Sequence, residues 1–157
     1  MPAINAQYDL HQINQLCQNT LVSHLGIEFT DIGADYLEAR MPVDARTVQP
    51  FRLLHGGASV ALAESLGSMA SACCVDASKQ QPVGLEINAN HLRAVTTGYV
   101  IGTARPIHLG GRTHVWEIKI EDEQHKLVCI SRLTIMLLDV TKSAAPKSQG
   151  SASNPPA

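Results

Sequence analysis

The feature that most constrains this chain is the segment at residues 55–75. From Gly56 onward it contains a single charged residue, Glu64, among apolar residues and many glycines, alanines and serines. That composition is too weakly hydrophobic for a helix in contact with lipid, and a run of about 20 residues fits a helix buried in a protein core. We therefore predict a central helix of about 30 Å that other elements cover.

After this helix the hydrophobic pattern changes to period two, which is typical of β-strands. Four such runs follow, separated by short turns: residues 83–91, 99–107, 115–120 and 127–138. The last run is apolar on both faces and resembles a central strand. Consecutive strands joined by turns pair antiparallel, and one face of the sheet must be covered. We predict an α+β domain in which the sheet wraps the long helix.

Alternation within the runs predicts which side chains face the helix. In residues 83–91 the odd positions are the more apolar, so we expect these to face it: Val83, Leu85, Ile87, Ala89 and His91. In residues 115–120 the same alternation places three large apolar side chains on one face: Trp116, Ile118 and Ile120. The close approach of helix and sheet is favoured by the small residues of the helix.

The rest of the chain completes a single domain. Residues 9–19 have the spacing of an amphipathic helix, with one apolar stripe made of Leu10, Ile13, Leu16 and Cys17. Residues 27–31 and 36–43 read as two strands. A chain of 157 residues fits one domain, which we place at residues 1–140. Residues 141–157 consist largely of Ser, Ala, Pro, Lys and Gly, and we expect a disordered tail there.

Charge and cysteine content exclude several functional classes. The net charge is −2 and the pI is about 6.4, so the chain lacks the basic field of a protein that binds nucleic acid or a membrane surface. The first seven residues do not form a secretion signal, which favours the cytoplasm. The four cysteines have no C-x-x-C spacing, and no histidine or carboxylate spacing indicates a metal site. We predict no metal and no cofactor.

Two features of the long helix bear chemistry. His55-Gly56-Gly57 stands where the helix begins, and backbone N–H groups there can bind an anion or a developing oxyanion. So short a motif also fits an ordinary helix start. Glu64 is more informative, because a buried carboxylate is costly unless it is paired or serves as a base or nucleophile. Ser68, one turn later on the same face, can hydrogen-bond this carboxylate or a water.

The spacing of these two features predicts more than one subunit. Glu64 lies eight residues after Gly56, which corresponds to about 12 Å of helix. One substrate carbonyl cannot contact both groups of a single chain. If both act on the same carbonyl, one of them comes from a second copy, so we expect a homo-oligomer with its active site at a subunit interface.

Further candidates lie outside the helix. Gln49 precedes it and can donate a hydrogen bond to a carbonyl oxygen, although without further context a solvated loop glutamine is the better interpretation. His91 falls on the face predicted to meet the helix, where a histidine is more often part of the core. Candidate contacts for substrate phosphates lie near strand ends and turns: Arg93, Gly111, Arg112 and Arg132. Arg105 is a further candidate contact for a substrate phosphate.

Three stretches together resemble the hotdog-fold acyl-CoA thioesterases. They are Gln49-Pro50 followed by LHGGASVALAES (54–65), then GLEINANH (84–91) and SRLT (131–134). The resemblance extends over residues 9–138. It is strongest to the bacterial branch that holds the 1,4-dihydroxy-2-naphthoyl-CoA hydrolase of menaquinone biosynthesis and the enterobactin-synthetase proofreading thioesterase.

The resemblance implies a fold, an assembly and residue roles. In that family two subunits pair their sheets edge to edge, and two dimers form a homotetramer that uses no metal or cofactor. The catalytic carboxylate would be Glu64, as general base or as nucleophile. The oxyanion would bind the backbone N–H of Gly56, supported by the side chains of His55 and Gln49, with these donors and the carboxylate coming from different subunits. Ser68 would position water.

Two more positions follow from the resemblance. His91 falls on a histidine near the acyl pocket. Arg52 is a departure, because relatives carry a small residue or glycine at its place in the loop. An arginine there leaves the loop conformation open and adds a basic group near the mouth of the pocket.

Residues and resemblance together predict an enzyme that hydrolyses aromatic acyl-CoA thioesters of the hydroxybenzoyl or dihydroxynaphthoyl type. Four alternatives stay open: a hotdog dehydratase of 3-hydroxyacyl chains, an acyl-CoA-binding module without turnover, a proofreading hydrolase of carrier-protein thioesters, and a housekeeping hydrolase of broad specificity. Glu64 favours hydrolysis, because a neutral binding module has no need of a carboxylate beside the acyl group.

Overall fold

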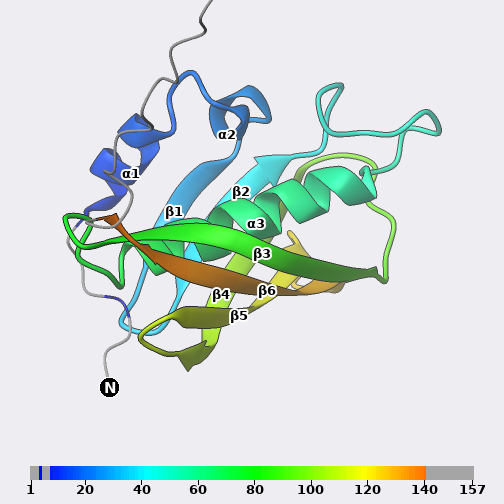
Figure 1. Ribbon diagram of the computed structural model, residues 1–157. Helices are drawn as coiled ribbons and strands as arrows, with labels where there is room; N and C mark the ends of the chain where they lie inside the picture. Colours follow the sequence, from blue (N-terminus) through cyan, green and yellow to red (C-terminus); the bar gives the residue numbers. More distant parts are fainter. Residues whose placement is uncertain (1–3, 5–7, 141–157) are drawn as a thin grey trace, which may run out of the picture.

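Helix α3 (Gly56–Ala72) lies against one face of an antiparallel sheet (Figure 1). The computed structural model describes Ile4 and residues 8–140, so the predicted tail at residues 141–157 lies outside the described residues. The other described elements are, in chain order, α1 (Leu10–Leu16), α2 (Leu21–His24), β1 (Glu28–Ile32), β2 (Leu37–Pro42), β3 (Gln80–His91), β4 (Tyr99–Leu109), β5 (Thr113–Asp122) and β6 (Leu127–Asp139).

The strands of the sheet follow the order β1-β2-β4-β5-β6-β3, and all neighbouring pairs are antiparallel. The predicted antiparallel pairing is therefore confirmed, but the strands are not all neighbours in chain order. β4, β5 and β6 form a meander, whereas β3 pairs with β6 at the far edge. The chain returns from β3 to β4 along residues 92–98, where the Leu92 N–H donates to Val128 O at 2.8 Å.

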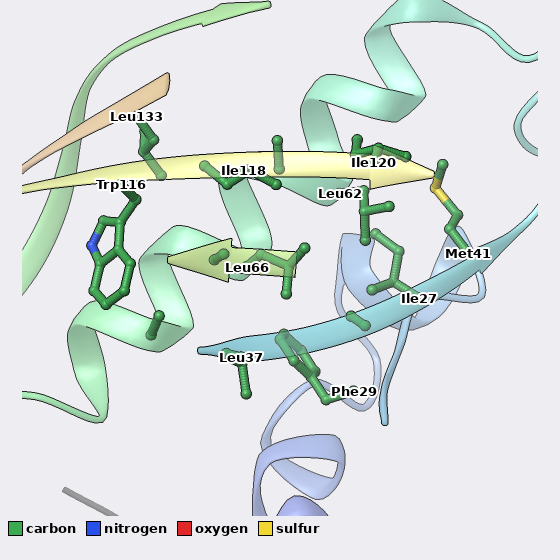
Figure 2. Packing of buried hydrophobic residues seen from close by; sticks show 14 of the residues in the cluster. Ile27, Phe29, Leu37, Met41, Leu62, Leu66, Trp116, Ile118, Ile120 and Leu133 are labelled. Atoms are coloured by element: carbon green, nitrogen blue, oxygen red, sulfur yellow. The ribbon is translucent and has the colours of Figure 1, made fainter. Parts of the chain in front are cut away.

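The core forms between α3 and the inner face of the sheet. Figure 2 shows Leu62 and Leu66 of α3 against side chains of β2 and β5. The predicted buried face of β5 is confirmed, because Trp116, Ile118 and Ile120 have no exposed surface. Each such side chain contributes roughly 1.5–3 kcal/mol when it leaves water.

The small residues of α3 allow the close contact that the sequence predicts. A Cβ added at Gly67 would lie 2.5 Å from Leu133 Cδ2 of β6, so a larger residue would push helix and sheet apart. The helix begins at the predicted place and ends three residues before the predicted end of the segment, with Cys73 as its C-cap. The predicted central helix is thus confirmed in position and in burial.

The predicted faces of β3 are only half right. A β-bulge interrupts the register between Gly84 and Glu86, so the alternation changes phase at Leu85. After the bulge Ile87 and Ala89 pack on the core as predicted. Before it the prediction is wrong, because Val83 and Leu85 are exposed and Gly84 faces the helix. A bulge adds one residue to a strand, which a strict period of two cannot anticipate.

Helix α1 is shorter than predicted and is anchored to β1. Asp9 caps it through a capping box with Gln12, which satisfies two backbone donors at the helix start. The amide of Asn14 exchanges two hydrogen bonds, each 2.9 Å long, with the backbone of Phe29 in β1. Of the predicted apolar stripe, Leu16 is 60% exposed and does not join the core.

Candidate active site

The N-terminus of α3 presents hydrogen-bond donors to the outside. His55 is the N-cap, and its Nδ1 accepts a hydrogen bond from the Gly57 N–H at 2.8 Å. A neutral imidazole that accepts at Nδ1 carries its proton at Nε2, so His55 presents an Nε2–H donor. Gly56 is the first helical residue, and N–H groups of the first turn have no acceptor within the helix. The two donors lie side by side along the chain at the positive end of the helix dipole.

His91 lies beside these donors. It is the last residue of β3, and its ring is so close that a Cβ added at Gly56 would lie 2.8 Å from His91 Nε2. A side chain at position 56 would therefore displace the His91 imidazole from its place beside the helix start. The structure brings together three predicted residues at this point: His55, Gly56 and His91.

Gln49 is held in the tight loop before the helix. Its side-chain Oε1 accepts a hydrogen bond from the Phe51 N–H, and its backbone N–H donates to Leu53 O at 2.8 Å. Because the side-chain oxygen is engaged, the NH₂ group is the part of this amide that can bind a carbonyl. Arg52 has a φ of 65°, the left-handed conformation that favours glycine. This explains in physical terms why glycine suits that position.

Glu64 lies in the middle of α3 on the side that faces β3. It is half-buried, less enclosed than the composition of the helix predicts. Ser68 Oγ donates a long hydrogen bond of 3.3 Å to Glu64 Oε1. Among the described residues no donor contacts Oε2. The carboxylate is thus held at one oxygen and open at the other, as a base or nucleophile must be.

The structure does not bring Glu64 and the helix start together within one chain. Both lie on the same straight helix, about 12 Å apart along its axis. The structure therefore has the predicted separation. The candidate residues fall into two sets, one around the Glu64 carboxylate and one around the hydrogen-bond donors of the helix start.

Thiol chemistry and metal ligation find no support in the described residues. The cysteines are free, and burial raises the pKa of Cys73 to about 11 and that of Cys74 to about 12. Both thiols are protonated at neutral pH, and a protonated thiol is a poor nucleophile. Over Ile4 and residues 8–140, no group of three or more His, Cys, Asp or Glu side chains could hold a metal ion. None of the helices in that part of the chain is long and apolar enough to cross a membrane.

Comparison with known families shows the class of protein to which the chain belongs. The family model described as the thioesterase superfamily matches residues 51–129, which contain the helix start, Glu64 and Ser68. The chain belongs to the thioesterase superfamily. This enzyme is therefore a thioester hydrolase, and its α+β architecture is the hotdog fold.

Relatives of the thioesterase carry names of different breadth. A protein of Pasteurella multocida, named as an esterase without a stated substrate, is 58% identical over 129 residues, or 82% of this chain and 92% of its own. The 1,4-dihydroxy-2-naphthoyl-CoA hydrolase of Escherichia coli K12 is 54% identical over 129 residues, covering 82% of this chain and 94% of the relative. The proofreading thioesterase EntH of Cronobacter turicensis is also 54% identical, covering 82% and 93%.

Solved structures agree with the fold of the thioesterase. The crystal structure of thioesterase HI1161 from Haemophilus influenzae has a TM-score of 0.87 and 49% identity, covering 91% of this chain and 99% of that one. A mutant of thioesterase PA1618 from Pseudomonas aeruginosa has a TM-score of 0.86 and 51% identity, covering 88% and 99%.

The remaining candidate contacts of the thioesterase do not converge within one chain. Arg93 follows β3 and is exposed, whereas Gly111 and Arg112 form the turn between β4 and β5. Arg132 is exposed on β6 between buried Ser131 and Leu133, so it lies on the face of the sheet that points away from α3. These residues are spread over three parts of the surface.

Arg105, also a candidate contact for a substrate phosphate, already forms an ion pair within the chain. Its guanidinium forms an exposed ion pair of 2.9 Å with Asp35. The pair lies between β4 and the turn that joins β1 and β2.

The sequence pattern does not predict two features of the structure around α3. Ser71, His114 and Trp116 form a buried hydrogen-bonded cluster at the C-terminal end of the helix. Burial lowers the pKa of His114, and the charge of His108 lowers it further. The second feature is Gly84, which lies against the Glu64 carboxylate. Only the period-two pattern of β5, which puts His114 and Trp116 on one face, could have hinted at the first.

Proposed function

We propose that this thioesterase hydrolyses aromatic acyl-CoA thioesters, of the hydroxybenzoyl or dihydroxynaphthoyl type, to the free acid and CoA. The observation that carries the proposal is the state of Glu64, a half-buried carboxylate anchored at Oε1 and open at Oε2. The aromatic acyl group is supported by the relative from Escherichia coli, whose name is that of a naphthoyl-CoA hydrolase.

In the proposed reaction Glu64 acts on the thioester through its open oxygen. As a general base, it takes a proton from a water whose oxygen attacks the thioester carbonyl. As a nucleophile, it attacks the carbonyl itself and forms an anhydride that water then hydrolyses. In both cases the C–S bond breaks, the CoA thiolate leaves and takes up a proton, and the acid is released. Ser68 keeps the other carboxylate oxygen in place.

The developing oxyanion needs donors that the same chain cannot supply. The Gly56 N–H and the His55 Nε2–H point to such a site, and the NH₂ group of Gln49 adds a third donor. Since they lie about 12 Å from Glu64 along α3, we propose that the donors and the carboxylate of one active site come from two subunits.

The edge strand β3 supports the proposed dimer. It is 12 residues long, pairs only with β6 among the described strands, and exposes Val83 and Leu85. A long edge strand offers unpaired backbone groups to another strand. We propose that two copies pair along β3 and that two such dimers form a tetramer.

Mixed variants test the shared site. Glu64→Ala lacks the base, and a His55→Ala/Gln49→Ala variant lacks two donors, so each alone is expected to be nearly inactive. Co-refolded in equal amounts, they should recover about a quarter of the wild-type activity, since half of the dimers are mixed and each mixed dimer holds one intact site. Activity that stays at the sum of the two separate variants would place each site within one chain.

Substrate class is tested by free-thiol release from benzoyl-, hydroxybenzoyl-, acetyl- and palmitoyl-CoA, with Glu64→Ala as the inactive control. We expect the highest kcat/KM for the aromatic thioesters. Equal rates on all four, or a preference for an aliphatic chain, would overturn the aromatic assignment and leave the hydrolase assignment standing.

A second candidate is proofreading of carrier-protein thioesters. It is favoured by the relative named EntH, which is as similar to this chain as the naphthoyl-CoA hydrolase is. Offering the same aromatic acyl group on CoA and on a phosphopantetheinylated carrier protein separates the two. A higher kcat/KM on the carrier protein would replace the first proposal.

A further inference from the structure

Strand β3 presents a glycine to the Glu64 carboxylate. A Cβ added at Gly84 would collide with Glu64 Oε1, the oxygen that also accepts the hydrogen bond from Ser68. The carboxylate therefore occupies the volume that a side chain at position 84 would fill.

The backbone does not require glycine at this position. The positive-φ glycines of the described chain are Gly26 and Gly98, and Gly84 is not among them. Its backbone conformation is one that an alanine adopts without strain. What is special about Gly84 is therefore the space that its missing side chain leaves.

The β-bulge directs this space to the helix. Gly84 pairs with Ile135 of β6, and the register shifts before Glu86. Without the extra residue Leu85 would occupy the inward position on this side of the strand. The bulge instead leaves Leu85 exposed and turns the one residue without a side chain toward Glu64.

We propose that Gly84 is a positioning residue for thioester hydrolysis: it provides the space that keeps Oε1 of Glu64 beside Ser68 and Oε2 free to react. This inference rests on the proposed role of Glu64. It extends the site to a residue that carries no functional group, on a strand that also forms the proposed subunit edge.

The predicted consequence is a loss of activity without a matching loss of stability. A methyl group at position 84 meets the far end of a flexible side chain, and Glu64 can rotate away at small cost. At Gly67 the same methyl group would meet Leu133 in the core, where packing cannot yield so easily. Gly84→Ala should lower kcat, whereas Gly67→Ala should lower thermal stability.

The experiment measures benzoyl-CoA hydrolysis and thermal unfolding for Gly84→Ala, Glu64→Ala and Gly67→Ala. We expect Gly84→Ala to lower kcat about 100-fold, since a displacement of about 1 Å can cost that much, with KM within about threefold of the parent value. Its Tm should stay within about 3 °C of the parent. A Gly84→Ala variant with parental kcat would overturn the inference.

A double substitution separates positioning from a structural role. Glu64→Asp withdraws the carboxylate by one methylene, so in that background Gly84→Ala should lower kcat further by less than about threefold. An equal further loss in both backgrounds would show that Gly84 acts on the fold and would overturn the inference. If Gly84→Ala itself unfolds, the Glu64→Ala/Gly84→Ala variant must fold as well as Glu64→Ala, because the collision is gone. A double variant that unfolds also overturns it.

The proposed function fails in a different way. Parental kcat in Glu64→Ala would remove the carboxylate from the mechanism, whatever Gly84→Ala does. Loss of activity in Glu64→Ala together with parental kcat in Gly84→Ala would keep the proposed function and remove only the role of Gly84.

Discussion

Helix α3 carries two polar clusters that differ in how completely their hydrogen bonds are made. Toward its C-terminal end, Ser71 Oγ accepts a hydrogen bond from Trp116 Nε1–H at 2.7 Å and lies 3.1 Å from His114 Nδ1. All three side chains are buried. Two turns earlier, Glu64 is half-buried, is held at one oxygen by Ser68 and is open at the other.

The contrast shows how one helix serves both the fold and the reaction. In the Ser71 cluster, the hydroxyl accepts a hydrogen bond from the Trp116 N–H and shares a second one with His114 Nδ1, so the hydroxyl is paired on both sides. Among the described residues, no buried side-chain nitrogen or oxygen lacks a partner. In the Glu64 cluster, an unsatisfied oxygen is tolerated because it is within reach of solvent or substrate. Complete pairing stabilises the core, and incomplete pairing leaves a reactive group.

The largest effect on activity is expected from a substitution in the Glu64 cluster. Glu64→Gln keeps the size and polarity of the side chain and removes its basicity, so kcat should fall by about 10²–10⁴-fold, the usual contribution of a general base. Tm should not fall, because no charge is then held in a half-buried position. Thiol release and thermal unfolding measure both. The matched control is Glu121→Gln on β5, for which parental kcat is expected.

The second effect concerns the helix start. His55→Ala removes both the N-cap acceptor of the Gly57 N–H and the proposed Nε2–H donor. We expect kcat to fall by about 10²-fold and stability to fall by about 1 kcal/mol. His55→Asn keeps a capping acceptor but does not reach as far, so it should restore stability and not kcat. Recovery of kcat in His55→Asn would assign His55 to helix capping alone.

The third prediction concerns a substitution in the Ser71 cluster, which should lower stability and leave activity unchanged. Ser71→Ala leaves the buried Trp116 N–H without its acceptor, which should cost about 1–3 kcal/mol of stability. The kcat should stay at the parental value, because this cluster takes no part in the reaction. Urea unfolding gives the cost. Ser65→Ala is the matched control, since its hydroxyl bonds only to Ala61 O of its own helix, and a small change is expected.

The smallest expected effect is a pH dependence of the free energy of unfolding, caused by His114 in the Ser71 cluster. Burial lowers the pKa of His114 in the folded state below its ordinary value of 6.5. As the pH falls through 6.5, the unfolded state takes up this proton before the folded state does, so the free energy of unfolding declines. Above 6.5 both states are neutral, and this contribution is flat.

Urea midpoints at about pH 7.5, 6.5 and 5.5 measure this slope. His114→Gln removes the titrating group, so the difference in slope between the two proteins isolates His114. Equal slopes would show that burial of this ring is not linked to protonation.

The sequence by itself predicted most of the helices and strands and named Glu64 and the helix start as candidate site residues. The lone charge in the small-residue segment 56–75 identified both the central helix and Glu64, because a buried segment tolerates a charge only with a reason. The spacing of Gly56 and Glu64 followed from helix geometry, and the motif around them led to the correct family. Local rules suffice for these features, since each depends on neighbours within a few turns.

Only the tertiary structure decided what faces the carboxylate. The bulge at Leu85 changes the phase of β3, and the position of β3 beside β6 depends on strand pairing across more than 40 residues of chain. Neither can be recognised in the local hydrophobic pattern, so a strict period of two places Gly84 on the face opposite to the one it occupies. The Ser71 cluster arises in the same way, from a helix and a strand more than 40 residues apart. Long-range pairing brings such groups together, and a periodicity read along the chain cannot record it.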